Sequence, residues 1–358
     1  MRIFISGICG FVGSSLAKSL LEKMEGLAIS GMDNLLRPGS ESNRLLLKKA
    51  GIQVLHGDVR MPSDIESAPP ADWVIDAAAN PSVLAGMDGR SSSRQLMEHN
   101  LIGSLNLLEY CKQHGAGLIL LSSSRVYSIP ALIGIPLCEK DSAFTLDNSK
   151  AMPAGLSANG IAEDFSVAAP VSLYGSTKLA SETVALEYGE TYGFPVWVNR
   201  CGVLAGAGQF GTAEQGIFSF WLHAHASRRP LRYIGFGGRG LQVRDALHPQ
   251  DLASIVVTQI ARRAADPAIP KILNLGGGPK NSMSLAELTA WCDQRFGAHA
   301  PQADHRPRPF DIAWLAMDSG LAQKTLGWKP ERTIESILEE IAAHVRQHPD
   351  WLERCGVS

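Results

Sequence analysis

Residues 1–13 read MRIFISGICGFVG, an apolar run followed at once by three glycines. The run Arg2–Ser6 predicts a buried strand, and Gly7, Gly10 and Gly13 stand where the chain would turn from that strand into a helix. The first glycine permits a tight turn, the second lets a pyrophosphate approach the backbone, and the third lets the helix pack on the strand. A glycine-rich turn without a ligand is the alternative. The strand and helix on either side favour a dinucleotide-binding loop, because the first turn of that helix offers free N–H groups to phosphate.

An acidic residue ends the second predicted strand. Leu27–Asp33 has the apolar character of a strand, and Asp33 stands twenty positions after Gly13. A carboxylate at that place accepts hydrogen bonds from the adenosine ribose, which favours NAD over NADP. Arg37 leaves the opposite interpretation open, because an arginine can instead meet a 2′-phosphate. Asp58 follows the third strand, where it either reaches the adenine or caps a turn.

Strand-like runs alternate with helical segments through the first two hundred residues. Further strands are predicted at Gln53–Gly57, Trp73–Asp76, Gly117–Ser122 and Val196–Arg200. Apolar residues at three-to-four spacing predict helices at Gly13–Met24, Ser92–Gln113 and Ser176–Tyr192. This alternation is typical of an α/β fold with a doubly wound parallel sheet, the Rossmann fold. We expect the strand-like segment Lys271–Leu275 to rejoin the same sheet.

Beyond the sixth strand the pattern becomes mixed, which predicts a second, smaller α/β domain made of separate pieces. We expect an NAD-binding domain of residues 1–203 plus 243–275, and a second, substrate-binding domain of residues 204–242 plus 276–358. The segment 128–172 is rich in Pro, Gly, Ser and Asn and is too long for an ordinary loop. It is either disordered or a functional insertion, and its position between two candidate catalytic elements favours an insertion.

Composition disfavours several classes of function. The chain has 358 residues, 45% of them hydrophobic, and its 33 Lys and Arg nearly balance its 35 Asp and Glu. The net charge of −2 creates no long-range field for nucleic acid or anionic lipid, so neither is expected as a partner. The six cysteines are scattered without metal-ligand spacing, which predicts free thiols and no metal site. No apolar stretch reaches the roughly 18 residues of a membrane span, and a cytoplasmic location is expected.

A tyrosine and a lysine four residues apart form the candidate catalytic pair. The sequence YGSTK places Tyr174 and Lys178 on one face of a helix. A free tyrosine is a poor base at neutral pH, and a nearby ammonium group favours its phenolate, so such a pair can act as general acid and base. Ser122, Ser123 and Ser124 end the fifth strand, at the sheet edge where ligands of open α/β folds bind. A hydroxyl there can orient a reacting oxygen.

Together these features resemble the extended short-chain dehydrogenase/reductase family, the group that contains NAD-dependent epimerases and dehydratases, over nearly the whole chain. Within it, three further stretches resemble the CDP-paratose 2-epimerases, also called CDP-tyvelose epimerases. These stretches are Gln209–Gly211 with Glu214–Gly216, Gln242–His248, and Asn274–Gly277 with Asn281–Ser282. The resemblance implies 2-epimerisation of a CDP-hexose, in which bound NAD transiently oxidises a sugar carbon and the hydrogen returns to the opposite face.

The resemblance also implies roles for single residues. Tyr174 would remove the hydroxyl proton, Lys178 would tune it and hold the nicotinamide ribose, and Ser123 would orient the sugar. Arg244 would pair with the diphosphate, the alternative being a surface ion pair with Asp245. The residues implied around NAD are Gly7, Gly10, Phe11, Val12, Gly13, Asp33, Asn34, Asp58, Val59, Ala77, Ala78, Ala79, Asn100, Ser122, Tyr174, Lys178, Arg200 and Val203. Those implied around the substrate are Ser124, Arg125, Gln209, Gln215, Gly216, Gln242, Arg244 and Arg308, with Arg306 at a related position.

Two departures from the family pattern leave the sugar open. Asp76 stands where the family usually has histidine, and Ser128 replaces a usual glycine. A 4,6-dehydratase needs two acidic residues where this chain has Ser124 and Arg125, so dehydration is disfavoured. A UDP-sugar 4-epimerase or a UDP-glucuronate decarboxylase remains the enzymatic alternative, and Asp33 disfavours an NADPH-consuming reductase.

An alternative from another class is a catalytically silent Rossmann protein that binds or regulates. The intact serine, tyrosine and lysine argue against it. Members of the family commonly pair through two helices of each subunit, here Ser92–Gln113 and Ser176–Tyr192. The resemblance therefore implies a homo-oligomer, a dimer or a tetramer.

Overall fold

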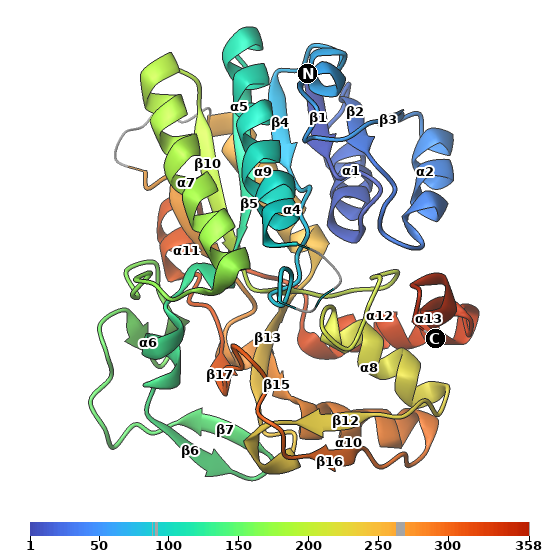
Figure 1. Ribbon diagram of the computed structural model, residues 1–358, viewed down its shortest axis with the longest axis vertical. Coiled ribbons are helices and arrows are strands. Elements are labelled where there is room, and N and C mark those ends of the chain that lie inside the picture. Colours follow the sequence, from blue (N-terminus) through green and yellow to red (C-terminus); the bar gives the residue numbers. More distant parts are fainter. Residues whose placement is uncertain (88, 90–91, 263–268, 358) are drawn as a thin grey trace.

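A seven-stranded parallel sheet forms the larger part of the protein, in a computed structural model that describes residues 1–357 without 88, 90–91 and 263–268 (Figure 1). The strand order is β14-β10-β5-β4-β1-β2-β3, and every neighbouring pair is parallel. The strands are β1 (Arg2–Ser6), β2 (Ala28–Asp33), β3 (Gln53–His56), β4 (Trp73–Asp76), β5 (Gly117–Ser123), β10 (Val196–Cys201) and β14 (Ile272–Leu275). The predicted doubly wound fold is confirmed, including the late strand that rejoins the sheet.

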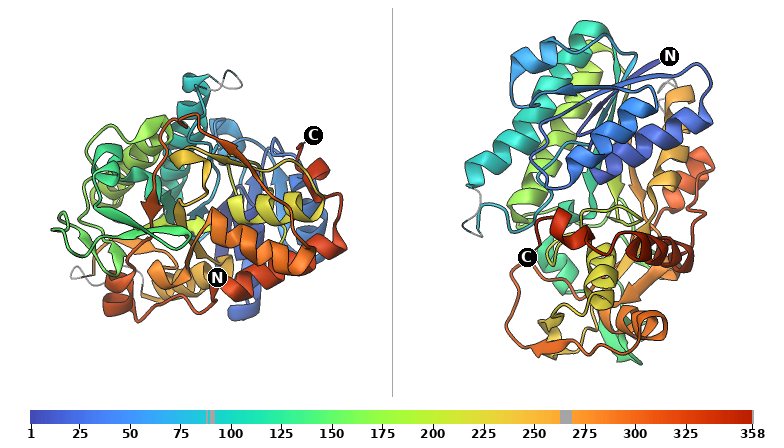
Figure 2. Two further views of the ribbon diagram at one scale, coloured as in Figure 1. Left: turned by 90° about the horizontal axis from the view of Figure 1, so that it is seen from below. Right: turned by 90° about the vertical axis from the view of Figure 1, so that its right-hand side faces the viewer.

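Helices cover both faces of this sheet, and the two layers lie on opposite sides of it in Figure 2. One layer contains α1 (Phe11–Lys23), α2 (Ser40–Lys49) and α9 (Pro249–Arg262); the other contains α3 (Pro62–Glu66), α5 (Gly103–His114) and α7 (Ser172–Tyr192). Alternate side chains of one strand point to opposite layers. In β1, Ile3 and Ile5 pack in the core that contains Leu16 of α1, whereas Phe4 packs in the core that contains Leu107 of α5.

Two helices differ in detail from the sequence prediction. The predicted helix Ser92–Gln113 consists of α4 (Ser93–Met97), a π-helical turn (Glu98–Ile102) and α5. Helix α7 begins four residues before the predicted Ser176, because the Ser172 hydroxyl accepts the N–H of Gly175 at 3.1 Å and caps the first turn.

The second, smaller part lies below the large sheet in Figure 1, beyond the carboxyl ends of its strands. Its sheet contains β11 (Val203–Leu204), β13 (Val243–Leu247), β15 (Ser282–Ser284) and β17 (Trp314–Leu315), and β12 (Arg232–Ile234) pairs with β16 (Gln302–Asp304). The helices here are α8 (Ile217–Ala226), α10 (Leu285–Phe296), α12 (Ile334–Gln347) and α13 (Trp351–Arg354). Strand β13 lies in this smaller sheet although its residues fall in the predicted NAD-binding domain, while α11 (Gly320–Leu326) packs back on β14. The division of the chain into domains therefore stays a prediction.

The segment 128–172 is folded. It contains α6 (Ile129–Ile133) and two short hairpins, β6 (Leu137–Lys140) with β7 (Ala143–Leu146) and β8 (Leu156–Ser157) with β9 (Gly160–Ile161). Leu156, Ile161 and Phe165 share a core with Trp314 and Met317 from the C-terminal part of the chain. The insertion is thus an ordered piece of the smaller part rather than a disordered loop.

Candidate active site

A cavity of about 750 Å³ opens at the carboxyl ends of the parallel strands, a size that suits a small-molecule ligand. It brings together most of the predicted site residues from both parts of the protein. From the larger part it is lined by Gly7, Gly10, Phe11, Val12, Gly13, Asp33, Asn34, Val59, Ala77, Ala78, Ala79, Ser122, Ser123, Ser124, Arg125, Tyr174 and Lys178. The rest of the predicted lining is Val203, Gln209, Gln215, Gly216, Gln242, Arg244 and Arg308.

The glycine-rich loop runs between β1 and α1 in a conformation that needs its glycines. Gly7 has a φ of 64°, and a Cβ on it would lie 2.8 Å from the Cα of Ala78. A Cβ on Gly13 would lie 2.3 Å from the carbonyl oxygen of Gly7, so only glycine lets α1 approach the loop this closely. Gly10 precedes α1 and provides no side-chain cap. The first N–H groups of α1 are therefore available to an anion in the cavity.

The carboxylate of Asp33 holds this loop in place from the end of β2. It accepts the N–H of Cys9 at 2.9 Å through Oδ2 and the N–H of Leu35 at 2.9 Å through Oδ1. Burial raises the pKa of Asp33, and these backbone N–H groups oppose the shift. Asp33 also lines the cavity, so it stands beside the loop as the sequence predicts.

Asp76, one of the departures from the family pattern, organises the wall beside the loop. The carboxylate of Asp76 accepts hydrogen bonds from the hydroxyls of Ser6 at 2.8 Å and Ser104 at 2.6 Å. The Ser6 hydroxyl in turn accepts the N–H groups of Ala77 and Ala78, both at 3.0 Å. The buried aspartate thus fixes the end of β4, whose following alanines line the cavity.

Three of the residues predicted around NAD lie outside the cavity wall. Asp58 accepts hydrogen bonds from Arg60 and Asn34, which outweigh the effect of burial and lower its pKa. The buried side chain of Asn100 bonds to both backbone groups of Asn80, at 2.8 and 3.1 Å, and so supports the loop after β4.

Arg200 is the third of these residues. It is buried and forms an ion pair with Glu182 of α7, with an N–O distance of 2.7 Å. Its guanidinium also lies 5.3 Å from the ring centroid of Tyr127. This arrangement ties β10 to α7, which carries the candidate catalytic pair, from behind the wall.

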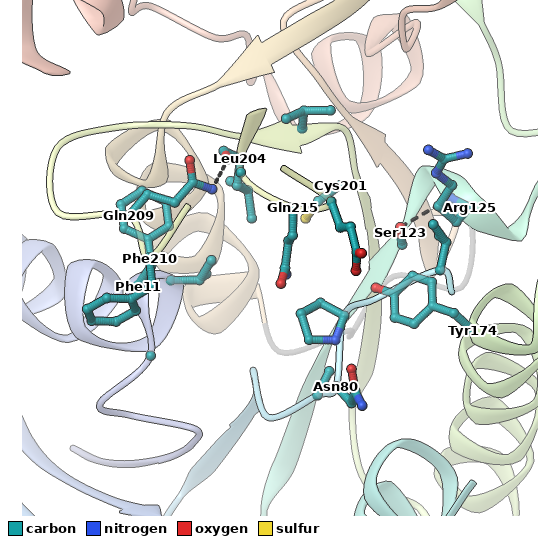
Figure 3. A pocket seen from close by; sticks show the side chains of 18 of the residues that line it. Phe11, Asn80, Ser123, Arg125, Tyr174, Cys201, Leu204, Gln209, Phe210 and Gln215 are labelled. Atoms are coloured by element: carbon teal, nitrogen blue, oxygen red, sulfur yellow. Dashed lines mark hydrogen bonds between the residues drawn. The ribbon is translucent and has the colours of Figure 1, made fainter. Parts of the chain in front are cut away.

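The candidate catalytic residues meet on one side of the cavity, where Figure 3 shows Ser123 and Tyr174 close together. Ser123 is the last residue of β5, and its hydroxyl accepts the N–H of Arg125 at 3.1 Å. Lys178 lies one helical turn beyond Tyr174 on α7, and its ammonium group donates to the carbonyl of Leu121 at 2.9 Å. That bond anchors the lysine on the strand that carries the serine.

Gly175, next to Tyr174, allows α7 to pack closely against the end of β5. A Cβ on Gly175 would lie 2.3 Å from the carbonyl oxygen of Arg125, which belongs to the turn after β5. Only glycine therefore lets the helix pack against the turn at this distance. The consequence is that Tyr174 and Ser123 reach the same part of the cavity.

Three arginines gather at the far end of the cavity around one carboxylate. Arg244 lies 3.7 Å from Asp311, and Arg125 donates a hydrogen bond of 3.3 Å to the carbonyl of Phe310. Arg308 lines the same end. Burial lowers the pKa of Arg125 to about 9, with Arg244 acting in the same direction, and burial also lowers the pKa of Arg244. Partly buried guanidinium groups that lie close together favour an anionic ligand, which offsets their repulsion and desolvation.

At this end the structure disfavours one alternative and one related position that the sequence suggested. The alternative partner of Arg244, Asp245, is buried and accepts the N–H groups of Gly278 and Met317, while Arg244 pairs with Asp311. Arg306 is exposed, pairs with Asp304 and does not line the cavity.

Some lining residues carry no signal in the sequence. Phe310 and Asp311 follow a proline-rich loop, and Gln95 and His99 lie in the predicted helix Ser92–Gln113 without a motif. Arg37, considered as a 2′-phosphate ligand, is bonded to the side chain of Gln215 at 3.1 Å and to the carbonyl of Phe210. These contacts depend on pairings between distant segments, which no local pattern reveals.

A Rossmann sheet that carries a glycine-rich loop, a strand-end serine and a helical Tyr–Lys pair defines an extended short-chain dehydrogenase/reductase. Residues 3–276 match the family described as the NAD dependent epimerase/dehydratase family, and the chain belongs to it. No helix among the described residues is long and apolar enough to cross a membrane.

Relatives with different substrates are similarly close. The chain is 29% identical to the CDP-paratose 2-epimerase of Salmonella typhi, over 80% of this chain and 82% of that protein. It is 26% identical to a UDP-glucuronate 4-epimerase of Thermodesulfobacterium geofontis, over 94% of this chain and 93% of that one. The solved structure of a UDP-glucuronic acid 4-epimerase from Bacillus cereus superposes with a TM-score of 0.75 at 22% identity, over 97% and 99% of the two chains, which shows the shared fold. The chain is thus related to nucleotide-sugar epimerases whose sugars differ.

Proposed function

We propose that this protein is an NAD-dependent nucleotide-sugar epimerase that inverts a hydroxyl-bearing carbon. The observation that carries the proposal is that one cavity joins a glycine-rich loop, a Ser–Tyr–Lys set and an arginine cluster. The glycine-rich loop suits a dinucleotide, and the Ser–Tyr–Lys set suits proton transfer at a hydroxyl group. The arginine cluster suits a diphosphate. The family to which the chain belongs supports the same conclusion.

The residues at the loop fit NAD. A Cβ on Gly7 or Gly13 would occupy the space of neighbouring backbone, so the loop is held in the form that brings its backbone close to a pyrophosphate. Asp33 is placed to accept hydrogen bonds from ribose hydroxyls, and Arg37 is engaged elsewhere, which favours NAD over NADP. NAD, when bound, supplies the reversible oxidation of the sugar carbon.

The side chains of this protein handle the proton and the orientation of the sugar. Tyr174 takes the proton from the reacting hydroxyl group and later returns it, since its hydroxyl faces the cavity beside Ser123 (Figure 3). Ser123 donates a hydrogen bond to the same sugar oxygen and fixes its position. Lys178, whose ammonium group donates to the carbonyl of Leu121, lies one helical turn beyond Tyr174 and places a positive charge on the same side of the cavity.

Within this proposal we favour a CDP-hexose, with inversion at C2, as the substrate. The sequence stretches around Gln209, Gln242 and Asn274 and the relative from Salmonella typhi support this choice. Charge in the arginine cluster supports an uncharged sugar. Arg125, Arg244 and Arg308 with Asp311 leave two positive charges, which a nucleoside diphosphate neutralises without a further carboxylate on the sugar.

A UDP-sugar 4-epimerase is the second candidate, because the relatives that act on UDP-sugars match over more of the chain. UDP-glucuronate decarboxylation and a silent binding role stay alternatives. A cytoplasmic location and assembly into a homo-oligomer stay predictions as well.

The test is turnover in deuterated water without added cofactor. The purified protein is incubated with CDP-, UDP-, GDP- and dTDP-sugars, and products are identified by NMR and mass spectrometry. We expect a CDP-hexose product that is inverted at C2, with unchanged mass and no deuterium at carbon, because the hydrogen never exchanges with solvent. A product that has lost water or carbon dioxide, or no product from any sugar, would overturn the proposal.

A further inference from the structure

Three segments that are far apart in the chain cover the cofactor end of the cavity. They are the loop after β2 at residues 37–39, the loop before α8 at residues 209–216, and the C-terminal segment at residues 351–357, which contains α13. Phe210, Trp351 and Cys355 form one buried cluster there, against which Phe11 and Val357 pack. The cluster thus joins the C-terminal segment, which lies outside the residues that match the family, to the loop before α8 and to the start of α1.

Trp351 fixes the loop before α8. It is only 6% exposed, and its ring stacks on Phe210 with a centroid distance of 5.5 Å and an interplanar angle of 18°. The indole N–H donates to the carbonyl of Gln209 at 2.9 Å. Gln209 and Phe210 line the cavity, so an aromatic side chain from the C-terminus determines where that wall stands.

Arg37 connects this loop to the larger part of the protein. Its guanidinium donates to the side-chain oxygen of Gln215 at 3.1 Å and to the carbonyl of Phe210. The neighbouring Gly39 approaches so closely that a Cβ on it would lie 2.9 Å from the ring of Phe210. Arg37, Phe210 and Gln215 all line the cavity, and Figure 3 shows Phe11 beside Phe210 at this end. The bridge therefore spans the cavity from one part of the protein to the other.

We propose that Arg37, Phe210 and Trp351 form a clamp that closes the dinucleotide end of the cavity and retains NAD from one turnover to the next. This inference rests on the proposed function. Gly10 and Asp33 line the same cavity as Arg37 and Phe210, so a dinucleotide bound along the glycine-rich loop would leave more easily once Arg37 releases the loop before α8. Retention suits an epimerase, because its cofactor returns to the starting state in every cycle. The three are positioning residues, and none is needed for the proton transfer.

The test measures how fast bound NAD exchanges. Protein loaded with NAD is mixed with excess deuterium-labelled NAD, and native mass spectrometry follows the exchange. We expect Arg37→Met and Trp351→Ala to exchange about ten-fold faster or more, since each loses hydrogen bonds or stacking that close the cavity. Trp351→Phe keeps the stacking and loses the bond to Gln209, so its rate should fall between those of Trp351→Ala and the wild type.

Trp291→Ala is the matched control. Trp291 is a partly buried tryptophan of α10 that packs under Arg295, and it does not line the cavity. We expect this variant to exchange NAD at the wild-type rate, with a similar loss of thermal stability to that of Trp351→Ala. Wild-type rates in both Arg37→Met and Trp351→Ala, or equally fast exchange in Trp291→Ala, would overturn the clamp while NAD binding stands. A wild-type protein that binds no NAD at all would overturn the clamp and the proposed function together.

Discussion

The two ends of the cavity are built in different ways. At the cofactor end, one continuous segment from Ser6 to Gly13 forms the glycine-rich loop, and its backbone and glycines set the shape of that loop. The substrate end consists of side chains from segments far apart in the chain, with Arg125, Arg244 and Asp311 meeting only in the folded protein. At the cofactor end the glycines leave room because they lack side chains. At the substrate end charged side chains from different segments meet. Substitutions at the two ends should therefore fail differently.

The largest effect is expected where the two ends meet, at Tyr174. Tyr174→Phe removes the hydroxyl group that exchanges a proton with the sugar and leaves the packing of the ring unchanged. We expect kcat to fall about a thousand-fold or more, while NAD affinity stays within about two-fold. Steady-state kinetics and fluorescence titration with NAD check both. Turnover near the wild-type rate would remove Tyr174 from the chemistry and leave the site without a general base.

The next largest effect breaks the cofactor end alone. In Gly13→Ala the new Cβ would lie 2.3 Å from the Gly7 carbonyl, so the loop or α1 must move. We expect NAD affinity to fall about a hundred-fold, since phosphate binding depends on the loop backbone. Gly134→Ala is the control, because its nearest neighbour lies at 3.3 Å and the glycine belongs to the insertion. Calorimetric titration with NAD measures both; equal affinities would mean that the glycine loop does not hold the cofactor.

How far the sequence predicts each end follows from this contrast. Glycines at fixed spacing between a strand and a helix are a local signal, and the loop, Asp33 and the Tyr174–Lys178 pair lie where they were predicted. Asn100 and Arg200, which were predicted to contact NAD, do not line the cavity and are bonded to Asn80 and Glu182, and a buried polar residue looks the same in a sequence whether it faces a ligand or a neighbouring helix. Asp311 carries no local signal, and the contacts of Arg37 could not be predicted, since the partners of both residues lie on distant segments.

A smaller effect should be confined to the substrate end. Arg244→Met removes a partly buried charge that lines the substrate end, where the diphosphate is proposed to bind. We expect the KM of the nucleotide sugar to rise ten- to hundred-fold, because a charge-assisted contact contributes about 1.5–3 kcal/mol. NAD affinity should not change. Arg306→Met is the control, since that arginine is exposed and lies outside the cavity. If both substitutions raised KM equally, general electrostatics rather than a specific site would explain the effect.

The smallest effect is expected in the pH dependence of stability, because the smaller part of the protein contains buried histidines. His223 of α8 is 3% exposed and contacts His344 of α12, and burial first, then His344 and His348, lower its pKa to about 3. An unfolded histidine titrates near 6.5, so His223 stabilises the fold fully above that pH and loses this contribution as the pH falls towards 3. Between pH 7 and pH 5 the free energy of unfolding should drop by about 2 kcal/mol from this residue.

His223→Gln cannot take up the proton and should lose most of this drop. Urea unfolding at pH 7 and pH 5 measures it, with tryptophan fluorescence as the probe, since Trp221 and Trp351 lie in the same part of the protein. Because α8 follows directly on the loop that carries Gln209 and Gln215, acid should loosen this loop and the smaller part of the protein before the large sheet unfolds. If His223→Gln showed the same pH dependence as the wild type, the acid sensitivity would come from other residues. His223 would then not make the smaller part of the protein less stable in acid than the large sheet.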